Sequence, residues 1–193
     1  MDLLDRIVAA DQAAFLAVNG AGSPALDPVM LAVSDLRMWV PLYLGFLVLV
    51  KLRWGWKGLW IAVPVIALMV LCSDTGSVLL FKNTVLRLRP CHEAALAGLV
   101  HLVPDGCGGR YGFVSSHAAN HFAIAALMAG MLQRRPRWAA LALFAWAGLI
   151  AYSRVYLGVH YPADVIVGGL YGTFIGTMAF VLFRSMHQRL IRA

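Results

Sequence analysis

Charged residues are scarce in this chain. Of its 193 residues, 13% are Asp, Glu, Lys or Arg, whereas 61% are hydrophobic, and the mean hydropathy is +0.77. Soluble domains have about 25% charged and 45–50% apolar residues. This shortage of charge excludes an ordinary soluble domain and predicts a polytopic membrane protein.

Acidic residues are fewer than basic ones. Nine Asp and Glu stand against 16 Lys and Arg, so the formal net charge is +7. Such a balance suggests nucleic acid or anionic lipid as a partner, but the positions of the basic residues follow membrane topology instead. We therefore expect membrane lipids around the chain and no nucleic-acid partner.

Cysteine is rare as well, and three residues exclude a disulfide-rich scaffold. Cys72 falls in a hydrophobic run, where we expect a small buried side chain. Cys91 and Cys107 fall in one connecting segment, so they are either two free thiols or a disulfide. If that segment faces an oxidising compartment, the disulfide is favoured.

Long hydrophobic runs are what the chain has in abundance. A helix that crosses a bilayer needs about 20 apolar residues. Five runs approach this length, and we predict spans at residues 27–50, 58–81, 117–132, 138–152 and 165–183. The fourth run is short, so its ends should extend into the flanking residues. The sequence therefore predicts an all-α, transmembrane helical bundle.

The N-terminal residues have a different pattern. Apolar side chains between residues 3 and 19 alternate with charged ones, as in an amphipathic helix that lies in the membrane interface. Glycines and Pro24 then end this helix. No internal repeat is evident, so we expect one domain over residues 1–193, with an interfacial helix and turn over 1–26 and an outer loop over 82–116.

Basic residues cluster in three segments between and after the spans. Residues 51–57, residues 133–137 and the tail after Phe183 together carry nine of the 16 lysines and arginines. Five spans place these segments on one side of the membrane, and the positive-inside rule makes that side cytoplasmic. The C-terminus should then be cytoplasmic, and the outer loop should face the other side.

Three polar clusters fall at the outer ends of these spans. They are Lys82 with Arg89-Pro90, then Ser115-Ser116-His117, then Ser153-Arg154 with His160 and Asp164. Singly, a lysine or arginine at a span end often only reaches the lipid headgroups. Together, three cations, two histidines and a carboxylate provide what a transferring phosphoryl group needs, because its negative charge is spread over three oxygens.

His160 and Asp164 are four residues apart. Pro162 lies between them and suits the first turn of a helix. Side chains four apart on a helix lie on one face and can touch. A carboxylate on one imidazole nitrogen fixes the tautomer and leaves the other nitrogen free to attack. The alternative is that these residues have no catalytic role. Arg154 would then lie at the membrane interface, and His160 would only hydrogen-bond to its neighbour.

The three clusters resemble the signature of the type 2 phosphatidic acid phosphatase superfamily. That family comprises membrane lipid phosphatases, with soluble acid phosphatases and vanadate-dependent haloperoxidases as relatives. The order and the intervals match over residues 82–164. The second motif departs from the family's Pro-Ser-Gly-His, because Val114 stands for the proline and Ser116 for the glycine. This departure puts the loop geometry around the phosphate in question.

The resemblance implies a phosphatase without metal or cofactor, acting on a lipid phosphate at the non-cytoplasmic face of a bacterial plasma membrane. It implies that His160 attacks phosphorus and forms a phosphohistidine, that Asp164 orients His160, and that His117 transfers protons. The residues implied to hold phosphate oxygens are Lys82, Arg89, Ser115, Ser116 and Arg154. It favours undecaprenyl diphosphate as substrate, ahead of lipid A phosphate, phosphatidylglycerophosphate and phosphatidate.

Three further points stay open. Asp74 lies inside the second span, where a carboxylate is costly. It could pair with a cation of the three clusters or with Arg37, and we expect a supporting structural role behind the residues that contact substrate. His117 and His121 have a spacing that can bind zinc, which would make a metal-dependent hydrolase, although no third ligand suggests itself. The chain could also be a channel or transporter lined by its intramembrane charges, a class of protein that needs no nucleophile.

Overall fold

The computed structural model describes residues 2–103, 106–132 and 137–192. Within these ranges the chain is helical and has no β-strand, which confirms the predicted all-α fold. The α-helices are α1 (Leu3–Asn19), α2 (Asp27–Ser34), α3 (Val40–Gly76), α4 (Asn83–Val85), α5 (Ser116–Met131), α6 (Arg137–Tyr156) and α7 (Pro162–Arg192). Shorter 3₁₀ turns are Leu36–Trp39, Pro90–His92 and Ala94–Leu96, and Ser77–Lys82 forms a π-helical turn.

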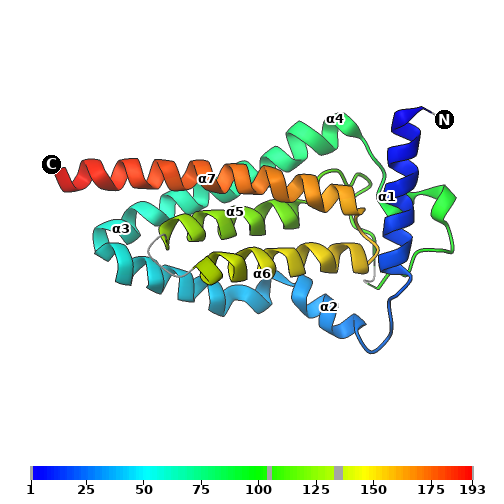
Figure 1. The fold of residues 1–193 in the computed structure, drawn as a ribbon, viewed down its shortest axis with the longest axis horizontal. Coiled ribbons are helices and arrows are strands. Elements are labelled where there is room, and N and C mark those ends of the chain that lie inside the picture. Colours follow the sequence, from blue (N-terminus) through cyan, green and yellow to red (C-terminus); the bar gives the residue numbers. More distant parts are fainter. Residues whose placement is uncertain (1, 104–105, 133–136, 193) are drawn as a thin grey trace.

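Helix α3 turns back on itself at Gly55 (Figure 1). Gly55 has a φ of 70° and a ψ of −174°, a conformation that glycine adopts without a steric penalty. The two halves of α3 then share one hydrophobic core, in which Phe46 lies with Val65 and Met69. The turn falls within the predicted connection at residues 51–57, so it separates the first two predicted spans.

The first predicted span does not begin at Asp27. Helix α2 ends at Ser34, and Asp35 adopts an extended conformation with a ψ of 121°. The Asp35 carboxylate accepts the backbone N–H of Arg37 at 2.9 Å and so starts a new 3₁₀ turn, after which α3 begins at Val40. The prediction was wrong here because a side-chain cap competes with continued helix at an aspartate.

Other boundaries also differ. Helical geometry runs past Phe81 to Val85, so the outer loop starts later than predicted. Helices α6 and α7 are longer than the runs predicted at 138–152 and 165–183. Cys72 is exposed on α3 rather than buried. In the predicted basic turn, Arg134 and Arg135 lie outside the described residues.

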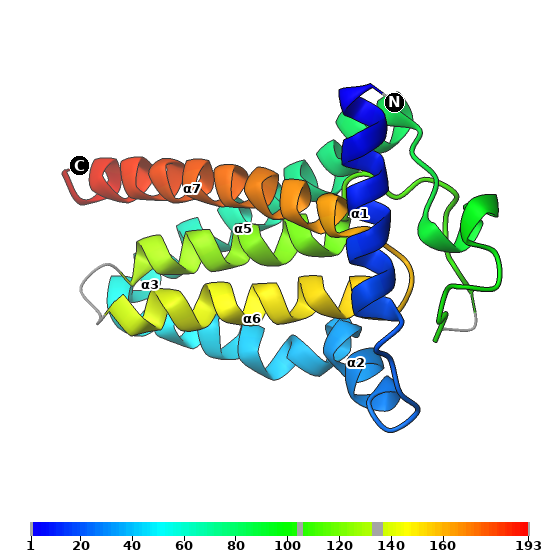
Figure 2. The same cartoon turned by 45° about the vertical axis from the view of Figure 1, so that its right-hand side comes forward.

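Helix α5 lies inside the bundle, between α6 and α7 (Figures 1 and 2). Gly172 and Gly176 of α7 allow the closest approach, because a Cβ at either position would collide with the carbonyl oxygen of Ala119 or Ala123. Among the described residues, three helical segments are long and apolar enough to cross a membrane: Leu36–Val85, Trp138–Tyr156 and Pro162–Arg192. The first holds the turn at Gly55. The count of five spans stays a prediction.

Helix α1 lies across one end of the bundle (Figure 2). Its Phe15 is fully buried, with its ring centroid 5.4 Å from that of Tyr161. At the other end of the helix, Leu3 and Leu4 remain exposed. This amphipathic helix is therefore anchored to the bundle through its C-terminal half, and its interfacial position stays a prediction.

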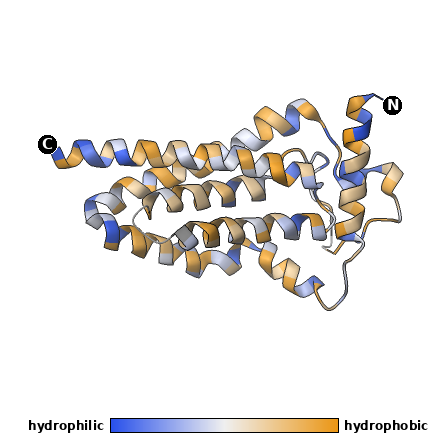
Figure 3. Ribbon diagram, in the orientation of Figure 1, coloured by the Kyte–Doolittle hydropathy of each residue, from blue (hydrophilic) through white to orange (hydrophobic). Residues whose placement is uncertain are grey.

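The two ends of the bundle carry different parts of the chain. The C-terminus and the turn of α3 lie at the end far from α1, where Figure 3 shows hydrophilic residues. Lys51, Arg53 and Lys57 flank that turn. Two of the three basic segments thus share one end of the molecule. The starts of α5 and α7 and the end of α6 lie at the opposite end, beside α1.

Candidate active site

A cavity of about 210 Å³ lies at the α1 end of the bundle. Its lining residues are Leu36, Asp74, Lys82, Arg89, Ser116, His117, Asn120, His121, Arg154 and His160. Six of these were predicted from clusters far apart in the sequence, namely Lys82, Arg89, Ser116, His117, Arg154 and His160. The fold therefore brings three cations and two histidines around one space.

The pair formed by His160 and Asp164 is buried. The Nδ1 atom of His160 lies 3.4 Å from Oδ2 of Asp164, and the side chains are 2% and 0% exposed. The backbone N–H of Tyr161 donates to the same carboxylate oxygen at 3.0 Å. With its Nδ1 facing the carboxylate, His160 keeps its Nε2 for another partner.

Burial also sets the charge of His160. Desolvation lowers the pKa of His160 to about 4, and the charges of Arg89 and Arg154 act in the same direction, while Asp164 opposes them. Since neutral pH lies far above this value, the ring is uncharged before an anion arrives. An uncharged imidazole is the nucleophilic form.

Lys82 and Ser116 are in direct contact. The Lys82 ammonium donates to Oγ of Ser116 at 2.7 Å, and this hydroxyl also lies 2.6 Å from Oγ of Ser77. Lys82 belongs to the π-helical turn Ser77–Lys82 that follows α3. The serine that replaces the glycine of the family motif therefore connects the π-helical turn Ser77–Lys82 with the start of α5.

The two arginines reach the cavity from other segments. Arg154, near the end of α6, donates to the hydroxyl of Ser34, and its buried Nε has no hydrogen-bond partner among the described residues. Arg89 donates through Nη1 to the carbonyl oxygen of Cys107 at 3.1 Å. A buried N–H without a partner is costly, and a bound anion would satisfy it.

Comparison with known proteins identifies this arrangement. The profile of the PAP2 superfamily matches residues 58–188, which include every residue lining the cavity except Leu36. The chain belongs to the PAP2 superfamily. This confirms the resemblance found in the sequence.

Similar PAP2 proteins are membrane lipid phosphatases. A lipid A 4'-phosphatase of Bacteroides thetaiotaomicron is 34% identical over 93% of this chain and 80% of its own length, and one of Porphyromonas gingivalis is 28% identical over 98% and 80%. An undecaprenyl-diphosphatase of Sulfolobus acidocaldarius is 28% identical over 74% and 62%. The crystal structure of Aquifex aeolicus LpxE matches with a TM-score of 0.60 and 25% identity, over 86% of this chain and 91% of that one.

Ser115 is not among the residues that line the PAP2 cavity, so its contact with phosphate stays a prediction. Its hydroxyl accepts the backbone N–H of Ala118 at 3.5 Å and so caps α5. Its own backbone N–H donates to the carbonyl oxygen of Asp164 at 3.0 Å. Ser115 therefore holds the start of α5 against the start of α7, and Ser116 is the serine that faces the cavity.

Asp74 lines the cavity but does not pair with a cation among the described residues. Its Oδ1 accepts a hydrogen bond from the Asn120 amide at 3.3 Å. Asn120 in turn accepts from the hydroxyl of Ser73. The partner of Asp74 is thus an amide on α5 rather than a cation, and its supporting role in the site stays a prediction.

In the histidine pair His117 and His121, the ring of His121 is held by two neighbouring groups. Nδ1 of His121 lies 2.7 Å from the His117 carbonyl oxygen, and Nε2 lies 2.9 Å from the Tyr43 hydroxyl. Both ring nitrogens of His121 are thus engaged. Across the described ranges, no three His, Cys, Asp or Glu side chains are grouped so that they could hold a metal ion.

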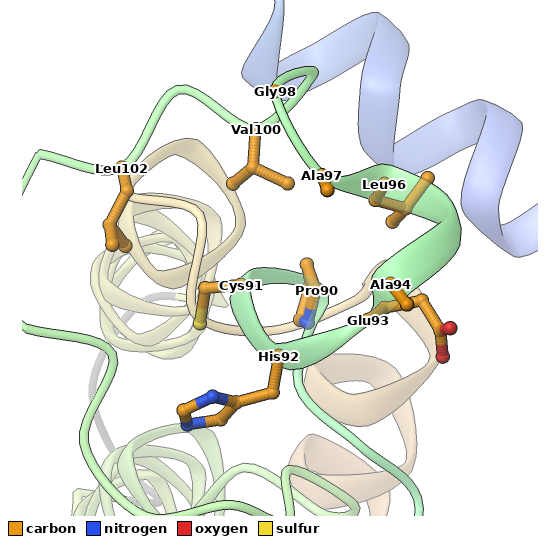
Figure 4. A pocket seen from close by; sticks show the side chains of 10 residues that line it. All are labelled: Pro90, Cys91, His92, Glu93, Ala94, Leu96, Ala97, Gly98, Val100 and Leu102. Atoms are coloured by element: carbon orange, nitrogen blue, oxygen red, sulfur yellow. The ribbon is translucent and has the colours of Figure 1, made fainter.

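Cys91 and Cys107 are joined as a disulfide, with their Cα atoms 6.0 Å apart. The bridge lies close to Arg89 in sequence, and the carbonyl of Cys107 is the Arg89 acceptor. The loop also encloses a separate cavity of about 450 Å³ (Figure 4). Its titratable side chains are His92 and Glu93, and no residue with a predicted catalytic or phosphate-binding role lines it.

Arg87 was missed from the sequence as a site residue. Its Nη1 donates to Oδ1 of Asp164 at 3.0 Å, and its Nη2 donates to Oδ2 of Asp11 at 2.7 Å. Asp11 of α1 also accepts the backbone N–H of Ala163 at 2.9 Å. Arg87 therefore links the N-terminal helix to the carboxylate behind His160, a contact that no local spacing indicates.

Replacing Arg87 with alanine should lower kcat by about 100-fold, the cost of a small misplacement of a catalytic group. The change removes the donor that holds Oδ1 of Asp164 and frees the carboxylate to rotate away from His160. Phosphate release measured against substrate concentration should show the loss in kcat, with KM little changed. The matched control is Arg110→Ala in the outer loop, where the arginine stacks near Tyr111. Equal losses in both variants would contradict the positioning role.

Proposed function

We propose that this PAP2 protein hydrolyses a lipid A-type phosphate monoester through a phosphohistidine at His160. The observation that carries the proposal is the single cavity in which Lys82, Arg89 and Arg154 surround His117 and His160. The two most extensive relatives reported above are lipid A 4'-phosphatases, whereas the undecaprenyl-diphosphatase shares less of its length. This reverses the substrate order expected from the sequence.

The first step forms a bond between Nε2 of His160 and phosphorus. The phosphorus–oxygen bond to the lipid breaks, its electron pair goes to the leaving oxygen, and His117 gives that oxygen a proton. The three cations stabilise the charge on the equatorial oxygens. The ring of His160 becomes positively charged in this step. The Asp164 carboxylate, which is hydrogen-bonded to that ring, stabilises the charge.

The second step reverses these roles. Neutral His117 takes a proton from water as the water oxygen attacks phosphorus. The bond between phosphorus and Nε2 breaks, inorganic phosphate leaves, and His160 returns to its neutral form. His117 is then protonated again and ready for the next leaving group.

The cavity is the right size for a headgroup phosphate. Pockets that enclose a whole drug-sized molecule measure about 300–1,000 Å³, and this cavity of about 210 Å³ is smaller. The lipid chains would stay in the bilayer while the phosphate enters. The cavity lies at the end of the bundle far from the basic turn of α3, which supports a non-cytoplasmic active site and a cytoplasmic C-terminus.

The test is phosphate release in detergent from lipid A, undecaprenyl diphosphate, phosphatidylglycerophosphate and phosphatidate, each with and without EDTA. We expect release to be fastest from lipid A and unchanged by EDTA. Release from none of the four would overturn the proposal and favour a channel or transporter. Loss of activity in EDTA that zinc restores would instead support the metal-dependent alternative.

A further inference from the structure

A second cavity, of about 280 Å³, adjoins the phosphate cavity. Arg89 and Arg154 line both of them. The other walls of the second cavity come from the end of α2, with Ser34 and Asp35, and from the loop at residues 106–108. A group bonded to a phosphate held by the two arginines therefore has a defined space to enter.

Besides the donors of Arg89 and Arg154, this second cavity has hydrogen-bond acceptors in its walls. Ser34 is 7% exposed, and its hydroxyl oxygen accepts from Arg154. The carbonyl oxygen of Cys107 accepts from Arg89. Asp35 adds a carboxylate that forms no ion pair within the described ranges. These acceptors can receive the hydrogen bonds that sugar hydroxyl groups donate, and Asp35 is the wall residue that would repel a second anion.

The charge of Asp35 is therefore decisive. Within the part of the chain that the structure describes, one of its two carboxylate oxygens accepts a hydrogen bond, from the Arg37 N–H at 2.9 Å, and the other has no partner. A phosphate in the second cavity would meet this negative charge, and like charges a few ångströms apart repel even near the protein surface. A sugar hydroxyl in the same place would gain a charge-assisted hydrogen bond.

We infer that the second cavity binds the sugar that carries the reacting phosphate, and that Asp35 selects a sugar phosphate monoester against a lipid diphosphate. The inference rests on the proposed phosphatase function and deepens it. It assigns to Asp35 a role in specificity, whereas Arg89 and Arg154 serve the phosphate in either class of substrate.

The variant Asp35→Asn tests this with little disturbance to the fold. Asparagine is as good as aspartate at starting a helical turn, so the bond to the Arg37 N–H should persist. Glu93→Gln is the matched control, because Glu93 also caps a 3₁₀ turn, with its carboxylate accepting from Ala95 at 3.5 Å, but lies outside both cavities.

The measurement is kcat/KM for three probes: lipid A, undecaprenyl diphosphate and phosphatidate, which is a monoester without a sugar. In Asp35→Asn we expect kcat/KM to fall about fivefold for lipid A, because a charge-assisted hydrogen bond becomes a neutral one. We expect it to rise about tenfold for undecaprenyl diphosphate, because repulsion is removed, and to stay constant for phosphatidate. Glu93→Gln should leave all three unchanged.

The pattern across the probes decides the outcome. A uniform fall for all three lipids in Asp35→Asn would mean a structural effect and would overturn the inference, as would three unchanged values. If the unmodified protein released phosphate from phosphatidate and undecaprenyl diphosphate but not from lipid A, the sugar subsite would be wrong while the phosphatase function stood. Release from no lipid would remove the proposed function itself.

Discussion

Replacing His160 with asparagine should abolish phosphate release, lowering kcat by at least about 10⁴-fold, as loss of a nucleophile does in other enzymes that form covalent intermediates. An amide nitrogen is not nucleophilic, so no phosphoenzyme can form. The asparagine amide can still donate to Asp164, which would otherwise be left as a buried carboxylate with fewer donors. The protein should therefore fold, and the loss should appear in kcat with any good lipid phosphate substrate.

Two measurements make this result specific. Gel filtration and thermal unfolding in detergent should match the unmodified protein, since the polar contacts around Asp164 are retained. His92→Asn is the control, because His92 is an exposed imidazole in the outer loop, away from the phosphate cavity. Residual activity of more than a few per cent in a folded His160→Asn protein would show that another group attacks phosphorus.

Sequence spacing was enough to predict the pair behind this reaction. His160 and Asp164 are four residues apart and Pro162 begins α7, so their contact follows from helix geometry. The prediction that Lys82, Arg89 and Arg154 meet at one place came from their positions at the outer ends of the spans, and family resemblance then assigned their roles. The fold puts all three around one cavity. Local rules, span positions and a known motif were therefore enough to name most of the charged residues that line this cavity.

Some contacts could not be predicted from the sequence, because they depend on tertiary packing or on which of two competing local structures forms. Ser115 and Ser116 are neighbours of the same type, but the one that caps α5 turns away from the cavity, and only the position of the helix start decides which. Hydropathy alone predicts one span from residue 27 to residue 50, but the helix is interrupted at Asp35, which caps a new 3₁₀ turn. Arg87 and Asp11 are 76 residues apart, and their ion pair exists only because α1 docks across the bundle.

Replacing His117 with alanine should separate the two chemical steps. The leaving oxygen of a lipid phosphate needs a proton, so the first step should slow by about 10²–10⁴-fold. An aryl phosphate such as p-nitrophenyl phosphate has a much more acidic leaving group and needs no proton donor. His160 should therefore still be phosphorylated by the aryl phosphate. Because the second step has lost its base, the phosphohistidine should accumulate.

The accumulation can be measured directly. Rapid mixing of His117→Ala with p-nitrophenyl phosphate should give a burst of nitrophenol of one per protein molecule, followed by slow turnover, and the trapped protein should contain acid-labile phosphate. The double variant with His160→Asn should give no burst, since the acceptor nitrogen is gone. The backbone carbonyl of His117 still accepts from His121 in both proteins, so this part of α5 should be retained. If His117→Ala slowed lipid and aryl substrates equally and gave no burst, His117 would not be the proton-transfer group, and the adjacent cavity-lining groups Lys82 and Asp74 would have to be tested in its place.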